Sequence, residues 1–476
     1  MADALGHVHF VAICGTGMGS LAGLLHARGI RVTGSDEGLY PPMSSALEGW
    51  GISVEEGFRA EHVTDDPPDL VVVGNAVGPD NSEARAALDE GFRVLSFPDA
   101  LHELAIAGRH SVVVSGTHGK TTTTALLGSV LVATGREPSL LVGGYCHDFS
   151  GSFREGEGEH FVVEGDEYDT AFFDKTPKFL HYGARTAVIT SIEFDHADIY
   201  RDLEHVKDAF RALVAGMPSD GVLVAAVDHE TVRDVVRDAP CRVVGYGLTD
   251  VGAPRWRANA VEVMQDGTAF RAQGADGAAL DVRVPLLGRF NAENALAALA
   301  TAEVLGVPAV DVASALARFG GVKRRQEVRG EEAGVLVMDD FAHHPTAVRG
   351  TLEALRARHA NRRIVAVFEP RTNTSRRAVF QERYVECFDA ADRVVVAAAP
   401  EGEIYSATGP VTERLSVDRL VSDLRARGID AVSPGGVDEI VAHLTPRCAP
   451  GDVVIVMSNG AFGNIWEKLL GALRSR

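Results

Sequence analysis

The residues best suited to chemistry lie in SVVVSGTHGKTTTTALL, residues 111–127. A run of valines leads into glycines and a Lys-Thr pair, and an apolar helical pattern follows. Glycines let backbone N–H groups surround phosphate oxygens, the lysine bridges the outer phosphates, and the threonine hydroxyl suits Mg²⁺. Val114 stands where the usual pattern has its first glycine, so this is a shortened variant that predicts binding of ATP or a related nucleotide. The loop residues expected to contact ATP are Gly116, Thr117, His118, Gly119, Lys120, Thr121 and Thr122.

A second glycine loop, GTGMGS at residues 15–20, lies between a predicted strand and a predicted helix. Asp36 ends the next predicted strand, and the spacing nearly matches the dinucleotide fingerprint, with Ser20 at the third glycine position. An NAD-dependent oxidoreductase is therefore one alternative. The same loop geometry serves any diphosphate, including that of a UDP-sugar, and a nicotinamide cofactor would leave the loop at 111–127 without a role.

Two candidate metal ligands follow strands of the middle part of the chain. Glu164 lies within FVVEGDE, and His196 ends the segment TSIEFDH. The carboxyl ends of parallel strands meet at the edge where open α/β sheets bind ligands. A carboxylate and a neutral imidazole beside ATP would hold Mg²⁺. The ordinary alternatives are a surface carboxylate and a packed, hydrogen-bonded histidine.

Further polar groups lie after the middle block. Asn291 and Asn294 are three residues apart, so they share a helix face and their amides can read a base edge; alternatively, Asn291 caps the helix. Arg324-Arg325 lies in a charged hinge, and DDFAHHP follows a predicted strand. An arginine that reaches the γ-phosphate from another domain would make catalysis depend on domain closure, whereas many charged hinges are simply solvated.

The elements that must position these groups alternate along the whole chain. Strand-like runs of Val, Ile and Ala alternate with amphipathic helices, which is typical of βα units and parallel sheets. They form three blocks, with a seam near residues 104–109 and a hinge at 320–330. The predicted strands cover residues 8–14, 31–36, 69–76, 93–97, 111–115, 160–167, 186–196, 221–228, 335–342, 362–370, 392–399 and 452–460. Helices are predicted near 82–90, 291–305 and 308–318.

Composition favours a multidomain cytoplasmic enzyme. The chain has 476 residues, of which 46% are hydrophobic and 24% charged, and its net charge is −20. That charge argues against nucleic-acid and anionic-membrane partners. The start, MADALGHVHF, lacks a basic region and a long apolar run, so no leader or membrane segment is expected. Five dispersed cysteines indicate a reducing compartment without a disulfide framework: Cys14, Cys146, Cys241, Cys387 and Cys448.

Together and in this order, the motifs resemble those of the Mur ligases, the ATP-dependent amide-forming enzymes of peptidoglycan synthesis. The resemblance spans essentially the whole chain and is strongest in GTHGKTTT, EFDHAD, the N-x-x-N helix start, the Arg-Arg hinge and DDFAHHP. It implies an α/β fold of three domains. These are a UDP-sugar-binding Rossmann-like domain at 1–107, a central P-loop ATPase domain with a mainly parallel sheet at 108–321, and a Rossmann-like amine-substrate domain at 322–476.

The resemblance also implies roles for individual residues. The expected catalytic residues are Lys120, Glu164, His196, Arg325 and Asp340. Those expected to hold Mg²⁺ are Thr121, Glu164 and His196. ATP is expected to contact Asn291, Asn294, Arg325 and Asp340 in addition to the phosphate loop. The UDP moiety is expected on Gly15, Thr16, Gly17, Met18 and Asp36. Position in the third block suggests Arg371, Asn373, Ser458 and Asn459 for the amine substrate.

This sequence departs from the family pattern at two positions. Phe290 stands where the helix-start motif usually has a histidine, which puts that one contact in doubt. Phe210 stands where some relatives carry a carbamylated lysine, and the alanine-adding and recycling branches lack that lysine too.

Several longer motifs resemble those of the recycling branch of the family, which joins UDP-N-acetylmuramate to L-alanyl-γ-D-glutamyl-meso-diaminopimelate. Its marks here are GSDEGLYPPMS, VVVGNAV, EGDEYDTAFFDK, FEPRTNTSRR and MSNGAFG. The alternative branch adds L-alanine to UDP-N-acetylmuramate and usually reads EADESD where this chain has EGDEYD. Folate-type or cyanophycin-type amide ligases and a non-catalytic nucleotide-binding module are more distant alternatives.

The implied reaction passes through an acyl phosphate. The lactyl carboxylate attacks the γ-phosphate of ATP, and the amine then attacks the activated carbonyl. Lys120, Mg²⁺ and Arg325 would neutralise the charge that builds up. Candidates for the general base are His196, His343 and His344, and the sequence predicts no particular oligomeric state.

Overall fold

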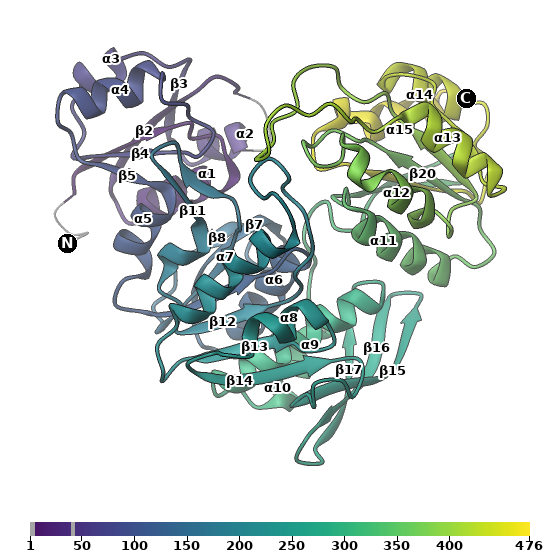
Figure 1. Ribbon diagram of the computed structural model, residues 1–476, viewed down its shortest axis with the longest axis horizontal. Helices are drawn as coiled ribbons and strands as arrows, with labels where there is room; N and C mark the ends of the chain where they lie inside the picture. Colours follow the sequence, from purple (N-terminus) through teal and green to yellow (C-terminus); the bar gives the residue numbers. More distant parts are fainter. Residues whose placement is uncertain (1–4, 40–42) are drawn as a thin grey trace.

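Three large sheets organise the chain in the computed structural model, which describes residues 5–39 and 43–476 (Figure 1). The first residues of the predicted leader-free start, 1–4, lie outside the described residues, as do residues 40–42 of the GSDEGLYPPMS motif. Within the described ranges, no helix is both long and apolar enough to cross a membrane. The five cysteines all lie in the described part of the chain and are free.

The N-terminal sheet has five parallel strands in the order β3-β2-β1-β4-β5. Its strands are β1 (His7–Val11), β2 (Arg31–Asp36), β3 (Ser53–Glu56), β4 (Leu70–Val73) and β5 (Val94–Ser96). Its helices are α1 (Thr16–Ala27), α2 (Met43–Gly49), α3 (Glu61–Thr64), α4 (Ser82–Asp89) and α5 (Phe97–Leu101), followed by a π-helical turn at His102–Ile106. The crossover between β3 and β4 puts the glycine loop after β1 at the switch point of the sheet, where ligands bind in such folds.

The central sheet has ten strands in the order β17-β16-β15-β14-β13-β12-β6-β9-β7-β8. The strands are β6 (His110–Ser115), β7 (Ser139–Cys146), β8 (Gly151–Arg154), β9 (His160–Gly165), β12 (Thr186–Ile189), β13 (Val222–Ala226), β14 (Arg242–Gly247), β15 (Trp256–Met264), β16 (Gly267–Gly274) and β17 (Ala279–Val284). A small hairpin, β10 (Asp169–Ala171) with β11 (Asp174–Pro177), and a 3₁₀ turn at Lys178–Tyr182 follow β9. Strands β7, β9, β6, β12, β13, β14 and β15 run parallel.

Five helices cover the two faces of the central sheet. They are α6 (Lys120–Ala133), α7 (Leu203–Ala215), α8 (Glu230–Val236), α9 (Arg289–Val304) and α10 (Ala309–Leu316). The apolar faces of α6, α9 and α10 share one core with Val112 and Val114, whereas α7 and α8 pack with Val113 on the other face. Because β6 is buried on both faces, its sequence is a continuous apolar run rather than an alternating one.

Antiparallel hairpins at the edges of the central sheet are the main elements that the sequence analysis missed. Strands β15, β16 and β17 pair antiparallel, as β7 and β8 do at the opposite edge. Asp-Gly pairs at 266–267 and 276–277 mark the two turns, and exposed and buried residues alternate along β16. An Asp-Gly pair between alternating strands is a strong hairpin signal, so these turns could have been predicted.

The third sheet has the order β18-β19-β23-β20-β21-β22, and only β18 is antiparallel to its neighbour. The strands are β18 (Glu327–Glu332), β19 (Val335–Asp340), β20 (Ile364–Phe368), β21 (Arg393–Val396), β22 (Asp430–Val432) and β23 (Val453–Met457). The helices are α11 (Pro345–Arg358), α12 (Gln381–Cys387), α13 (Val417–Ala426), α14 (Val437–Leu444) and α15 (Ile465–Arg474), with 3₁₀ turns at Ala378–Phe380 and Phe462–Asn464. Helices α11–α13 cover one face, and α14 and α15 the other.

The α/β architecture and nearly all predicted strands are confirmed, but several strands end earlier than predicted. The strand predicted at 186–196 leaves the sheet after Ile189. Thr190 still donates to Ser115 O of β6, but the Thr190 and Ser191 side chains also hydrogen-bond the backbone of His118 in the phosphate loop. The domain boundaries at 107/108 and 321/322 fall outside the strands and stay predictions.

Candidate active site

The phosphate loop connects β6 to α6 and is shaped by its two glycines. Gly116 and Gly119 have φ values of 131° and 82°, a left-handed region that favours glycine. A side chain would also collide with Thr190 at Gly116 and with Asn294 at Gly119. Helix geometry leaves the first N–H groups of α6 without intrahelical acceptors, so they are available to donate to an anion such as a phosphate group.

Lys120 is held beside this loop by a carboxylate that the sequence analysis did not name. Its Nζ donates to Gly116 O and to Glu167 Oε2, both at 2.7 Å. Glu167 is almost fully buried and also contacts His196, whose Nε2 lies 3.0 Å from Oε1. Burial opposes ionisation of Glu167, but the two cationic neighbours lower its pKa to about 2. Glu167 follows Glu164 by three residues at the carboxyl end of β9, which is the signal that could have found it.

Thr121 and Glu164, two of the three predicted metal ligands, lie together. Thr121 Oγ1 donates to Glu164 Oε1 at 2.9 Å, and the backbone N–H of Gly143 donates to the other carboxylate oxygen at 2.7 Å. Burial raises the pKa of Glu164 against the influence of Lys120. Arg325 reaches the same point from the linker, because its Nη2 donates to Thr121 Oγ1 at 3.1 Å.

His196, the third predicted ligand, is bound to other carboxylates in this structure. Burial opposes its charged form, yet Asp195 and Glu167 raise the pKa of His196 to about 9. Its ring lies 4.1 Å from the ring of Tyr168, centroid to centroid, and its backbone φ is 52°. His196 is therefore an imidazolium paired with Glu167 in this structure, and its part in holding Mg²⁺ stays a prediction.

The linker to the third domain is fixed by Asp340. The backbone N–H of Gln326 donates to Asp340 Oδ2, and that of Ala342 donates to Oδ1, both at 2.8 Å. Burial raises the pKa of Asp340, and Arg325 counteracts this effect. Arg324 and Gln326, on either side of Arg325, have φ values of 61° and 52°. Asp340 thus stabilises a strained turn that directs the Arg325 side chain toward Thr121.

The two asparagines of α9 contact each other and the start of α6. Asn294 Nδ2 donates to Asn291 Oδ1 at 3.0 Å, and Thr123 Oγ1 donates to Asn294 Oδ1 at 3.3 Å. The helix begins after Gly288, and the Asn291 amide donates to Leu287 O, so the capping alternative for Asn291 is wrong.

The two family departures are both packed residues. Phe290 lies against the third domain, where a side chain at Gly350 of α11 would come within 3.1 Å of its ring. Phe210 is fully buried in α7, with its ring centroid 5.2 Å from that of Phe179. Neither position can supply the polar side chain that other relatives carry there.

The N-terminal glycine loop connects β1 to α1 and is closely packed. Gly15 precedes the first turn of α1, and an added Cβ at Gly17 would come within 3.0 Å of Phe97. Asp36 accepts the backbone N–H of Cys14 at 2.8 Å and so supports the loop. The Met18 side chain is buried in the core, which leaves only its backbone for a ligand. Thr16 starts α1.

Three of the four predicted amine-substrate residues line one cavity of about 230 Å³ between the central and third domains. The lining residues are Tyr168, Asp195, His196, Asp198, His343, Arg371, Thr372, Asn373, Thr374 and Asn459. Ser458 is fully buried, its hydroxyl donates to Glu369, and it does not line this cavity.

The three histidines predicted as candidates for the general base differ in whether they have a ring nitrogen that is unprotonated and not hydrogen-bonded. His196 is protonated, as described above. His344 uses both nitrogens, because Nδ1 accepts Thr346 N–H at 3.2 Å and Nε2 faces Phe194 O at 3.2 Å. His343 contacts Phe341 O through Nδ1 at 3.1 Å, which requires the proton on that nitrogen and leaves Nε2 unprotonated. Burial lowers the pKa of His343, so it is neutral.

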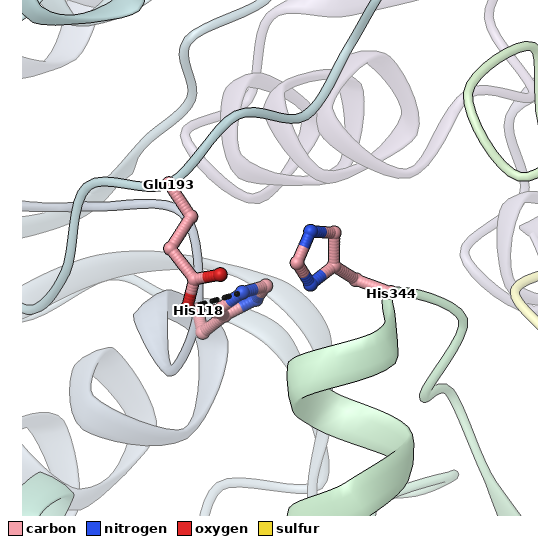
Figure 2. A group of neighbouring side chains, drawn as sticks. All are labelled: His118, Glu193 and His344. Carbon is pink, nitrogen blue, oxygen red and sulfur yellow. Dashed lines mark ion pairs between the residues drawn. The ribbon is translucent and has the colours of Figure 1, made fainter. Parts of the chain in front are cut away.

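His118, Glu193 and His344 converge where the phosphate loop meets the third domain, and Figure 2 shows their side chains pointing toward one another. Their potential ligand atoms lie within 4.8 Å of one another, a spacing compatible with a metal ion. However, both His344 nitrogens are engaged, and the Arg383 guanidinium contacts Glu193 Oε2 at 2.9 Å. The Arg383 guanidinium already neutralises the Glu193 carboxylate, which disfavours binding of a metal cation there. We therefore interpret the cluster as an interdomain contact.

Acid should destabilise the third domain through His344. Burial lowers its pKa from 6.5 to about 3, so unfolding takes up a proton between these values and stability falls as the pH drops below 6.5. We expect this group alone to remove about 2 kcal/mol between pH 7 and pH 5. The variant His344→Asn keeps an acceptor for the Thr346 N–H and should flatten the decline, as measured by calorimetric unfolding. An equal decline in both proteins would contradict this prediction.

Comparisons with known proteins agree with this geometry. Three family models match in sequence order: the Mur ligase family catalytic domain at residues 7–109, the Mur ligase middle domain at 114–302 and the Mur ligase glutamate ligase domain at 324–460. The UDP-N-acetylmuramate–L-alanyl-γ-D-glutamyl-meso-2,6-diaminoheptandioate ligase of Escherichia coli (strain K12) is 36% identical over 98% of each chain. A UDP-N-acetylmuramate–L-alanine ligase of Streptomyces avermitilis is 35% identical over 99% of this chain and 98% of its own.

Solved structures give the same result. The murein peptide ligase of Psychrobacter arcticus 273-4 has a TM-score of 0.74 with 34% identity and covers 99% of both chains. The sheets, the phosphate loop and its ion pair, together with these relatives, define an ATP-dependent ligase that forms amide bonds. The chain belongs to the Mur ligase family. This membership favours the ligase interpretation over the pyridine-nucleotide alternative.

Proposed function

We propose that this ligase joins UDP-N-acetylmuramate to L-alanyl-γ-D-glutamyl-meso-diaminopimelate, the reaction named for the Escherichia coli relative. The observation that carries the proposal is 36% identity to that relative over 98% of each chain. The cavity beside His196 can accommodate the polar groups of an amine substrate, because Arg371 and Asn373 line it and can meet carboxylate and amide groups. The second candidate is L-alanine, since relatives of that specificity are nearly as similar.

We propose the following chemistry for the described residues. The lactyl carboxylate attacks the γ-phosphate to give an acyl phosphate and ADP, and the amine then attacks the acyl carbonyl, expelling phosphate. Lys120 and Arg325 lower the repulsion between the two anionic reactants. His343 accepts the proton of the attacking amine at its unprotonated Nε2, because it is the neutral histidine that lines the cavity.

Mg²⁺ fits the donors at Thr121 and Glu164, which are hard oxygen ligands beside the phosphate loop. When bound, the ion would neutralise phosphate charge. His196 would join them only after losing its proton and its contact with Glu167. The remaining predicted contacts stay part of the proposal: Asn291, Asn294 and Asp340 for ATP, and Gly15, Thr16, Gly17, Met18 and Asp36 for the UDP moiety.

Phosphate release measured with ATP, Mg²⁺ and UDP-N-acetylmuramate tests the proposed substrate. We expect turnover with the tripeptide and little with L-alanine. The opposite preference would move the protein to the alanine-adding step without changing the proposed mechanism. No phosphate release with either amine would contradict the proposal as a whole.

A further inference from the structure

Glu193 lies between the phosphate loop and the third domain, in the segment that follows β12. Its backbone N–H donates to Thr117 Oγ1 at 2.9 Å, and Thr117 N–H donates to Ser191 O at 2.9 Å. The segment 190–193 therefore packs against the phosphate loop and is hydrogen-bonded to it. A displacement of Glu193 would be transmitted directly to the residues that surround the nucleotide phosphates.

The Glu193 side chain reaches two domains with its two carboxylate oxygens. Oε2 accepts the Thr346 hydroxyl at 2.8 Å and Arg383 Nη2 at 2.9 Å, both from the third domain. Oε1 lies 3.5 Å from Nε2 of His118, a residue of the phosphate loop (Figure 2). His118 and the third domain lower the pKa of Glu193 although burial raises it, so the carboxylate is charged.

The contact between Glu193 and His118 is incomplete. His118 Nε2 is buried and has no hydrogen-bond partner among the described residues. A movement of about 0.5 Å would bring the 3.5 Å separation to hydrogen-bond length. The neighbouring ring of His344 lies 4.7 Å away, centroid to centroid, so a shift of the third domain also moves the group that packs on His118.

An exposed ion pair would contribute little to the stability of the domain contact, but the Glu193 side chain is only 27% exposed. Its partners Arg383 and Thr346 lie in the other domain. Among the described residues, another carboxylate contact across this boundary joins Asp195 Oδ2 to Nε2 of His343 at 3.8 Å, a longer separation than the 2.9 Å between Glu193 and Arg383. Arg383 is further fixed by Phe380, over whose ring its guanidinium lies at 5.3 Å. Because the Glu193 carboxylate contacts Arg383 on one side and lies beside His118 on the other, a shift of the third domain would move the phosphate loop as well.

We propose that Glu193 is a positioning residue that couples docking of the third domain to the geometry of the phosphate loop. Arg383 and Thr346 orient the carboxylate, and the carboxylate orients His118. The phosphate loop is thereby set for transfer only when the amine-presenting domain is in place. This inference rests on the proposed function, since it assumes an amide-forming reaction that uses both domains.

A double-mutant cycle with Glu193→Gln and Arg383→Met tests the coupling. Each single variant should lose about 10-fold to 10²-fold in kcat, because small misplacements of reacting groups have effects of that size. The double variant should lose no more than the worse single variant, since both changes break one chain of contacts. The KM for ATP should also rise, because Glu193 acts through His118 of the phosphate loop. A general loss of folding would instead lower the active fraction and the unfolding temperature and leave the KM for ATP unchanged.

Glu332→Gln is the matched control. The Glu332 carboxylate accepts hydrogen bonds from Arg474 Nη2 at 2.6 Å and Nε at 2.9 Å, within the third domain. The substitution therefore removes a similar ion pair that does not cross a domain boundary. Its kcat should equal that of the wild type. Losses that multiply in the double variant, or a Glu193→Gln variant with wild-type kcat, would overturn the proposal.

The cycle is run with whichever amine supports turnover, so a wrong substrate assignment would not affect it. If neither amine reacts, the proposed function fails on its own account. Small-angle scattering of the same ligand-free proteins then decides the inference. Glu193→Gln and Arg383→Met should each increase the radius of gyration while Glu332→Gln does not, and unchanged scattering would overturn the proposal.

Discussion

Replacing Lys120 with methionine should reduce amide-forming turnover by about 10²-fold to 10³-fold, the usual effect of removing one preorganised charge at a transition state. The reason is the encounter of two anions, a carboxylate and the γ-phosphate. The Lys120 ammonium lies at the phosphate loop and is nearly buried, so its charge is weakly screened. Its contacts to Gly116 O and Glu167 define its position before ATP arrives.

Lys175→Met is the control for this prediction. Lys175 also pairs with a carboxylate, Asp169, at 2.6 Å, but its side chain is 67% exposed. We expect wild-type turnover from this control. The Lys120 variant should remain folded, because the charged His196 still neutralises Glu167. Equal turnover of the Lys120 variant and the wild type, at equal unfolding temperature, would remove the lysine from the mechanism.

The phosphate loop could be predicted because its determinants are local. A buried strand, two glycines and a Lys-Thr pair follow one another within a short stretch, and each has its own conformational requirement. The α/β architecture follows for a similar reason, since β-branched runs alternate with helical patterns. The edge hairpins extend this mainly parallel sheet with antiparallel strands, which the alternation of strands and helices does not indicate, although Asp-Gly pairs mark their turns.

The partners of the charged residues could not be predicted from spacing. Glu164 lies near the end of β9 and Glu167 follows the strand, and only the pairing of β9 with β6 decides which of them meets Lys120 and which meets Thr121. His196 follows β12, which lies on the other side of β6 from β9, and the spacing of the chain does not indicate that it meets Glu167. Strand order is a tertiary property that neighbouring residues do not encode.

Contacts across domains were equally inaccessible. Phe290 could be identified as a departure from the family, yet its contact with α11 depends on how the third domain docks. Glu193 lies in a motif that the sequence analysis quoted, and nothing in its spacing indicates Arg383, which is 190 positions later in the chain. Such pairs require the folded arrangement of the domains.

Replacing Glu167 with glutamine should destabilise the central domain by about 3–5 kcal/mol, the usual effect of removing one partner from a buried ion pair. Lys120 and His196 would both lose their carboxylate, and their side chains have little access to water. We expect the loss as a lower unfolding temperature of the central domain in calorimetry. Glu159→Gln is the control, because Glu159 also lies near a histidine, His160, at 3.6 Å, but is 76% exposed.

The pH dependence of this effect distinguishes it from a general loss of packing. His196 has a pKa near 6.5 when unfolded and about 9 when folded, so its contribution to stability is complete below pH 6.5 and is lost as the pH rises through 9. Since Glu167 supplies part of that raised pKa, the difference in stability between wild type and Glu167→Gln should be largest between about pH 4.5 and pH 6.5 and should shrink toward pH 9. It should also shrink below pH 4.5, because the pKa of Glu167 is 4.5 when unfolded and about 2 when folded. A difference that does not change with pH would mean that Glu167 only fills space. A difference that shrinks as expected would show that one buried carboxylate holds His196 in its charged form beside Lys120.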